Sequence, residues 1–121
     1  MDKYRLADDD NPLKRSLMEL TLRFEDSKFA RDYDGMADAI ESIKSKIKAK
    51  AISAGSKNKD SIKRVEQILS WYRNKEINYS YVMPDGSRSV MYPSDMPKKI
   101  NANLTSAYER LVQQMEKLEL I

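Results

Sequence analysis

Residues 36–54, MADAIESIKSKIKAKAISA, decide the fold class of this chain. Their spacing of three or four residues places the apolar side chains on one face of an α-helix, so the stretch predicts an amphipathic helix with one buried side. Gly55 follows as a stop, because glycine readily adopts the backbone conformation that ends a helix. The side chains of the predicted apolar face are Met36, Ile40, Ile43, Ile47, Ala51 and Ala54.

The same spacing recurs before and after this stretch. In residues 12–31, Asn11 can cap the first backbone amides, and Pro12 loses no hydrogen bond at the first helical position. Residues 60–75 form a third predicted helix, preceded by a polar connection at residues 56–59. The buried side chains expected of the two helices are Leu13, Leu17, Leu20 and Phe24 in the first, and Ile62, Val65, Leu69 and Tyr72 in the other, where Ile68 and Trp71 widen the apolar side.

The period changes from helical to alternating after residue 75. Large apolar side chains alternate with Asn78 and Ser80 up to Met83, which is typical of a β-strand. The sequence Pro84-Asp85-Gly86 is a turn signal, because proline presets the first central position and glycine accepts a positive φ. We therefore expect a β-hairpin over residues 77–92, with its larger side chains packed against Trp71 and the last helix.

A last helix is predicted from about residue 100 to 120. Its apolar side chains at positions 104, 108, 111, 115 and 118 have the alternating spacing of a coiled coil over about two heptads. The short seam favours a core face, and a homodimer through this helix is the alternative. The predicted fold class is mostly α: a single helix-rich domain of four main helices, with one β-hairpin before the C-terminal helix and an acidic, flexible segment at residues 1–10.

Composition excludes most catalytic designs. The 121 residues suit one domain and include no cysteine and no histidine. Disulfides, thiolate nucleophiles, imidazole acid–base chemistry and zinc sites with Cys or His ligands are therefore excluded. Three isolated glycines supply no phosphate-binding loop. No apolar run reaches the length of a membrane span, and the acidic N-terminus is unlike a signal peptide. We expect a cytoplasmic, non-enzymatic binding protein without a cofactor.

The basic stretch, residues 44–64, suggests a function in nucleic-acid binding. It holds eight Lys or Arg and a single acid, Asp60, and such a density of cations can displace counterions from phosphates. Three helices, a hairpin and a further helix also resemble the element order of winged helix–turn–helix proteins, with the hairpin as the wing. The alternative is a solvated lysine-rich face. The candidate contacts with DNA or RNA are Lys44, Lys46, Lys48, Lys50, Lys57, Lys59, Lys63, Arg64, Gln67 and Arg88.

The hairpin suggests a second function, in protein binding. Its apolar side chains exceed what a small two-stranded element can hide on one side. Any that remain exposed could bind a protein partner, since tyrosine offers a large contact area at low entropy cost. In this alternative the chain is a small accessory or assembly protein, for example of viral origin, and the C-terminal helix contributes to the interface. The candidate contacts are Tyr79, Tyr81, Met83, Met91 and Tyr92.

Residues 30–41 come close to a calcium-binding loop. Asp32, Asp34, Gly35, Asp38 and Glu41 match positions 3, 5, 6, 9 and 12 of an EF-hand, whereas Ala30 supplies no ligand at position 1. The pattern favours a plain connection between two helices in which Asp34 caps the second helix. We therefore expect no metal site.

Overall fold

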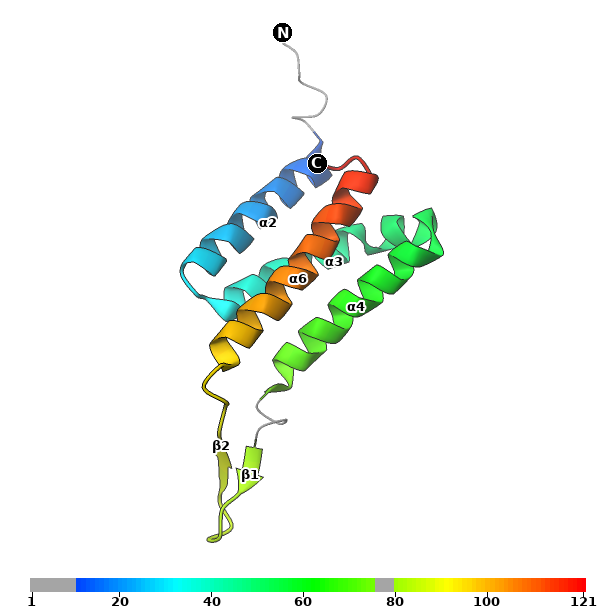
Figure 1. Ribbon diagram of the computed structural model, residues 1–121. Helices are drawn as coiled ribbons and strands as arrows, with labels where there is room; N and C mark the ends of the chain where they lie inside the picture. The colour runs from blue at the N-terminus through cyan, green and yellow to red at the C-terminus, as the bar shows by residue number, and fades with distance from the viewer. Residues whose placement is uncertain (1–10, 76–79) are drawn as a thin grey trace.

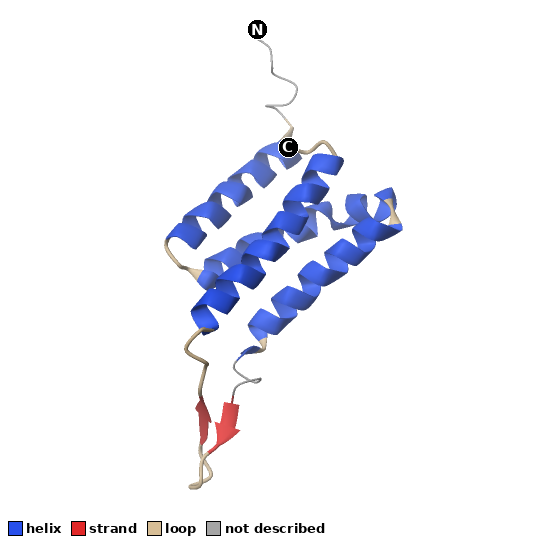
Figure 2. Ribbon diagram, in the orientation of Figure 1, coloured by secondary structure: helices blue, strands red, loops and turns tan. Residues whose placement is uncertain are grey.

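The computed structural model describes residues 11–75 and 80–121 and shows the helices and hairpin in the predicted order (Figures 1 and 2). The mostly α fold, with a hairpin before the C-terminal helix, is confirmed. The expectation for residues 1–10 lies outside the described residues, as does the part of the predicted hairpin before Ser80. The elements are α2 (Pro12–Phe29), α3 (Tyr33–Ala54), α4 (Ser56–Arg73), β1 (Ser80–Val82), β2 (Arg88–Val90) and α6 (Met96–Lys117).

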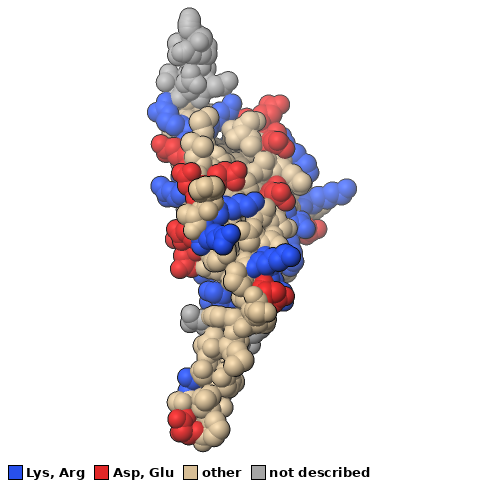
Figure 3. All heavy atoms as spheres, turned by 60° about the vertical axis from the view of Figure 1, so that its left-hand side comes forward, with Lys and Arg blue, Asp and Glu red and all other residues tan. Residues whose placement is uncertain are grey.

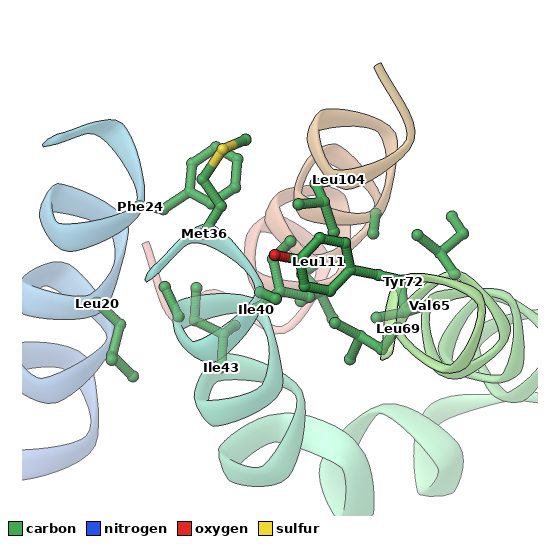
Figure 4. Packing of buried hydrophobic residues seen from close by; sticks show 14 of the residues in the cluster. Leu20, Phe24, Met36, Ile40, Ile43, Val65, Leu69, Tyr72, Leu104 and Leu111 are labelled. Carbon is green, nitrogen blue, oxygen red and sulfur yellow. The ribbon is translucent and has the colours of Figure 1, made fainter. Parts of the chain in front are cut away.

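The core lies where the apolar faces of the four helices meet, with α3 in contact with each of the other three helices (Figure 4). The ring of Phe24 in α2 stacks on Tyr108 in α6, with ring centroids 3.8 Å apart. Leu104, Leu111 and Met115 of the coiled-coil-like seam are fully buried. The seam therefore belongs to the core of the bundle, and a homodimer would need another surface of α6.

The starts of α2 and α3 depend on side-chain capping. Asn11 accepts hydrogen bonds from the backbone amides of Leu13 and Lys14, which confirms it as the cap of α2. The cap of α3 is Asp32 and not Asp34 as expected, because the Asp32 carboxylate accepts from the amide of Gly35 at 2.9 Å. A Cβ at Gly35 would lie 2.5 Å from that carboxylate, so the close approach requires glycine.

Three helices begin earlier than predicted, α3 at Tyr33 and not at about residue 36, and α4 and α6 by about four residues each. The expected polar connection at residues 56–59 is the first turn of α4, since Gly55 alone separates it from α3 and Lys59 donates its amide hydrogen bond to the Gly55 carbonyl. The last helix begins at Met96, which is buried, with Pro97 in the first turn where a missing amide costs nothing. The first turns of α4 and α6 hold few apolar residues, so they show no helical spacing of apolar side chains. The sequence pattern therefore placed the starts of α4 and α6 too late.

The hairpin forms at the predicted turn but lies beyond the end of the bundle (Figure 1). Its strands are antiparallel and pair Tyr81 with Ser89, and Gly86 at the turn has a φ of +89°. For the described residues 80–92, the expectation that the large side chains pack against Trp71 and the last helix is wrong, since those of residues 81–83 and 90–92 are exposed. Tyr72 and Met96 already close the core at this end of α4 and α6, so the hairpin begins past the last core layer.

Candidate functional site

The hairpin carries most of the exposed apolar side chains of the described chain. Six of the eleven large hydrophobic residues that are exposed in the described ranges lie in residues 81–92, on the two strands, in the turn or directly after β2. A concentration of this kind marks interaction sites more often than single exposed hydrophobic residues do. We call these six residues the hairpin surface: Tyr81, Val82, Met83, Val90, Met91 and Tyr92.

Both faces of the hairpin are apolar. Side chains alternate across an extended strand, so Tyr81 and Met83 lie on one face, while Val82 and Val90 lie on the other. The two most exposed are Val82 and Met91, at 62% and 66%. A two-stranded ribbon is marginally stable by itself in water, and its outer backbone edges can accept a further strand. The hairpin surface is therefore suited to contact with a partner.

Hydrogen bonds fix the tip of the hairpin. The backbone amide and hydroxyl of Ser87 both donate to the Asp85 carboxylate, at 2.9 and 2.6 Å, and these bonds lower the pKa of Asp85 below its usual value. The guanidinium of Arg88 donates to Ser80 Oγ, farther from the turn. Asp85 is thus the charged group at the tip, and the predicted contact Arg88 lies apart from the lysines of the basic stretch.

Two cations of the basic stretch take part in partly exposed ion pairs at the surface of the bundle. Lys48 of α3 donates to Glu66 of α4 at 2.7 Å, and Lys44 lies 2.6 Å from Glu41 and 3.5 Å from Glu66. Burial lowers the pKa of Lys44, but its hydrogen bond and proximity to the two carboxylates raise it overall. The hydrogen bond from Lys48 is the largest cause of the lowered pKa of Glu66. Lys44 and Lys48 therefore join α3 to α4.

The other cations of the stretch point in several directions. Lys46 lies about 160° around α3 from Lys44 and Lys48, at about 100° per residue, so it faces away from Glu66. Arg64 and Gln67 line a shallow hollow between α4 and Asn103 of α6. On the face drawn in Figure 3, basic and acidic side chains are interspersed over the bundle, and the hairpin is mostly uncharged. The remaining predicted contacts Lys50, Lys57, Lys59 and Lys63 are exposed.

Each carboxylate of the candidate calcium loop has a partner within the protein. Asp32 caps α3, Asp34 accepts a hydrogen bond from the Tyr72 hydroxyl, and Asp38 pairs with Arg73 at 3.0 Å. Glu41 pairs with Lys44. Within the described residues, no three acidic side chains come together as a metal site. The loop connects two helices, and the contacts with Tyr72 and Arg73 join it to α4.

The sequence did not predict a groove that lies between α2 and α6. Its volume is about 780 Å³, and it lies where α2 begins and α6 ends. Met18 lines the groove from the side of α2 that faces away from the core. Leu22 lies four residues later and is equally exposed, and this helical spacing of two apolar residues could have indicated a second apolar face of α2. The lining residues are Lys14, Arg15, Met18, Thr21, Tyr108, Val112, Leu120 and Ile121.

Comparison with known proteins gives no relative from which a function could be transferred. No protein-family model, no curated protein and no solved structure matches this chain. Among the helices of the described chain, none combines the length and apolar character required to cross a membrane.

Proposed function

We propose that this protein is a non-enzymatic protein-binding module, a small accessory or assembly protein that binds through the hairpin surface. The observation that carries the proposal is the place of six exposed apolar side chains on a two-stranded hairpin beyond the end of the bundle. Monomeric proteins rarely expose such a group without a use for it.

The energetics of the hairpin agree with binding. Transfer of a valine or methionine side chain from water into an apolar contact stabilises the bound state by about 1.5–3 kcal/mol, and tyrosine adds contact area with few rotatable bonds. Burial of Val82, Met91 and Tyr81 together would therefore offset a substantial part of the entropy cost of association. The hydrogen bonds at Asp85 and Gly86 fix the turn in advance, which reduces the cost of ordering on binding.

A second candidate function is nucleic-acid binding by the outer side of α4, which its exposed cations favour. Lys57, Lys59, Lys63 and Arg64 have no ion pair within the described ranges, and the nearest acids in the sequence are Asp60 and Glu66. The connection through Gly55 is shorter than the turn of about three to four residues in helix–turn–helix motifs. The hairpin surface therefore supports protein binding better than the basic stretch supports nucleic-acid binding.

Photo-crosslinking tests the proposed function directly. A photoreactive amino acid at Val82 or Met91 should give covalent protein adducts in an extract of the native source, and nuclease treatment should not remove them. The matched control positions are Leu22 and Phe29, which are exposed apolar residues outside the hairpin. Equal adduct yields at all four positions, or loss of the hairpin adducts after nuclease treatment, would contradict protein binding through the hairpin.

A further inference from the structure

The sole tryptophan of the chain lies at an open hollow between α4 and α6. Trp71 is half-buried and lines this hollow of about 170 Å³ together with Arg64, Gln67, Ile68 and Asn103. Part of the ring packs against the core, and the rest can be reached from solvent. An aromatic ring beside a guanidinium and two side-chain amides offers a stacking surface as well as hydrogen-bond donors and acceptors.

Arg64 and Trp71 belong to a stripe of side chains along α4. Lys57, Arg64 and Trp71 are spaced by seven residues, so they lie within about 40° of one another around the helix. Lys59 and Lys63 lie about 140° and 100° from Arg64 in the same projection. The stripe beside α6 therefore includes two of the cations of α4, and Lys59 and Lys63 lie outside it.

A second stripe runs along α6 on the side that faces α4. Asn103 lines the hollow with Trp71, and Lys99, Arg110 and Lys117 lie within about 40° of Asn103 around α6. Arg110 is half-buried, and its Nε has no hydrogen-bond partner among the described residues. At 1.5 Å per residue the stripe is about 27 Å long from Lys99 to Lys117, so it follows most of the junction between the two helices.

The two stripes bring five cations to one side of the molecule. The acids beside them are Asp60 in α4 and Asp95 before α6, whereas Glu66 pairs with lysines of α3. Glu109 and Glu116 lie about 80° or more from the α6 stripe. We call the five cations, with Trp71 and Asn103, the α4–α6 face. None of the five forms an ion pair in the part of the chain that the structure describes: Lys57, Arg64, Lys99, Arg110 and Lys117.

We propose that a single strand of nucleic acid binds along the α4–α6 face, with one base stacked on Trp71. Proteins that bind single strands combine a basic surface that follows the phosphates with aromatic rings on which bases stack. A double helix keeps its bases stacked on one another, so it offers phosphates to the cations but no free base to Trp71. Because the α4–α6 face shares no residue with the hairpin surface, it is a further binding site and independent of the proposed function.

The fluorescence of Trp71 reports the contact directly, because the chain has no other tryptophan. The probes are oligothymidine and oligouridine of about 12 nucleotides, within the range of about 4–16 nucleotides that single-strand sites cover. At about 50 mM salt each should quench the emission in a saturable titration, and the tighter probe identifies DNA or RNA as the preferred strand. At about 200 mM salt the dissociation constant should rise roughly a hundredfold, because five contacts of about −0.7 each give a slope of about −3.5.

Two variants with the same change in charge locate the site. Arg64→Glu with Lys99→Glu reverses two cations of the α4–α6 face, and Lys59→Glu with Lys63→Glu reverses two cations elsewhere on α4. All four positions are exposed, so both variants should retain the helical circular dichroism of the wild type. The anisotropy of a labelled oligothymidine should show at least about tenfold weaker binding to the first variant than to the second. Trp71→Leu should also weaken binding by about tenfold, as expected when one base loses its stacking partner.

Four results would overturn the inference: no binding of either probe at about 50 mM salt, equal losses in the two charge variants, a duplex that quenches Trp71 as strongly as the single strands, or equal quenching by polyglutamate. The last result would show that the α4–α6 face takes an acidic protein segment instead. If Trp71→Leu fails to fold, the quenching of the wild type and the two charge variants still decide. Hairpin adducts in a protein that binds neither probe would overturn this inference alone, and probe binding without hairpin adducts would overturn only the proposed function.

Discussion

The hydroxyl of Tyr72 donates a hydrogen bond to Oδ1 of Asp34, which ties the last turn of α4 to the first turn of α3. The ring of Tyr72 is buried in the core, as Figure 4 shows. Burial raises the pKa of Tyr72 above its usual value, and the hydrogen bond to Asp34 raises it further. One side chain thus contributes both to the apolar core and to a polar contact between two helices.

We expect Tyr72→Phe to destabilise the protein by about 1 kcal/mol at neutral pH through loss of this hydrogen bond. The raised pKa means that wild-type stability is complete below the unfolded pKa of about 10 and falls as the pH rises above it. Urea unfolding at neutral and alkaline pH should show a smaller alkaline loss in Tyr72→Phe. Part of the alkaline loss of stability should remain in Tyr72→Phe, because burial also raises the pKa of Tyr108. An alkaline loss as steep as that of the wild type would contradict this role of Tyr72.

Glu66 should contribute stability that acid removes. Its pKa is lowered in the folded protein, so the contribution is complete above the unfolded pKa of about 4.3 and is lost as the pH falls through the folded value. Because its side chain is about one-third exposed, we expect Glu66→Gln to cost only about 0.5–1 kcal/mol at neutral pH. Thermal unfolding should show this difference shrinking in acid, and Glu19→Gln, at an exposed position of α2, is the matched control at neutral pH.

The apolar spacing in the sequence predicted the helices, because a buried face requires the period that a helix imposes. It placed the cap of α3 at Asp34 instead of Asp32, since aspartate is a good cap at either position and the outcome depends on which carboxylate reaches the amide of Gly35. The turn at Gly86 was predicted because its residue types demand a positive φ.

The places of the candidate sites were harder to predict. Alternation in the hairpin shows which side chains share a face, but not whether the hairpin lies against the helices or past their ends. The charge of the basic stretch was evident, whereas the pairing of Lys48 with Glu66 joins residues 18 positions apart and depends on how α3 meets α4. The groove is formed by two helices from opposite ends of the sequence, so no local sequence pattern predicts it.

Gly86→Val should weaken the hairpin and leave the bundle almost unchanged. Valine resists the φ of +89°, at a cost of about 1–2 kcal/mol to the turn. Because the hairpin lies outside the core, the melting temperature should move little, while NMR contacts between Ser80 and Val90 should weaken. Gly86→Asn is the control, since asparagine accepts positive φ more readily. Intact cross-strand contacts in the valine variant would show that the turn is built differently.

Calcium should not bind residues 32–41. The carboxylates there already cap α3 or pair with Tyr72, Arg73 and Lys44, and Ala30 lacks a ligand atom. NMR spectra should keep the same amide shifts in this segment up to about 1 mM calcium, the upper end of EF-hand affinities. Saturable shifts at micromolar calcium would show that the metal can displace these contacts.

A side-by-side capture experiment tests most directly whether the hairpin or the basic stretch carries binding. Immobilised wild type, the Val82→Ser, Met91→Ser variant, and a charge-reversal variant with Lys57, Lys59, Lys63 and Arg64 changed to Glu are exposed to one extract. The retained protein and nucleic acid are measured at about 50 and 200 mM salt. Protein binding through the hairpin predicts that the charge-reversal variant retains the protein partner at both salt concentrations and that the hairpin variant loses it. The opposite pattern would contradict it. In that pattern only the charge-reversal variant loses the bound material, and the affinity of the wild type for nucleic acid falls roughly a hundredfold from 50 to 200 mM salt, as expected for about four phosphate contacts.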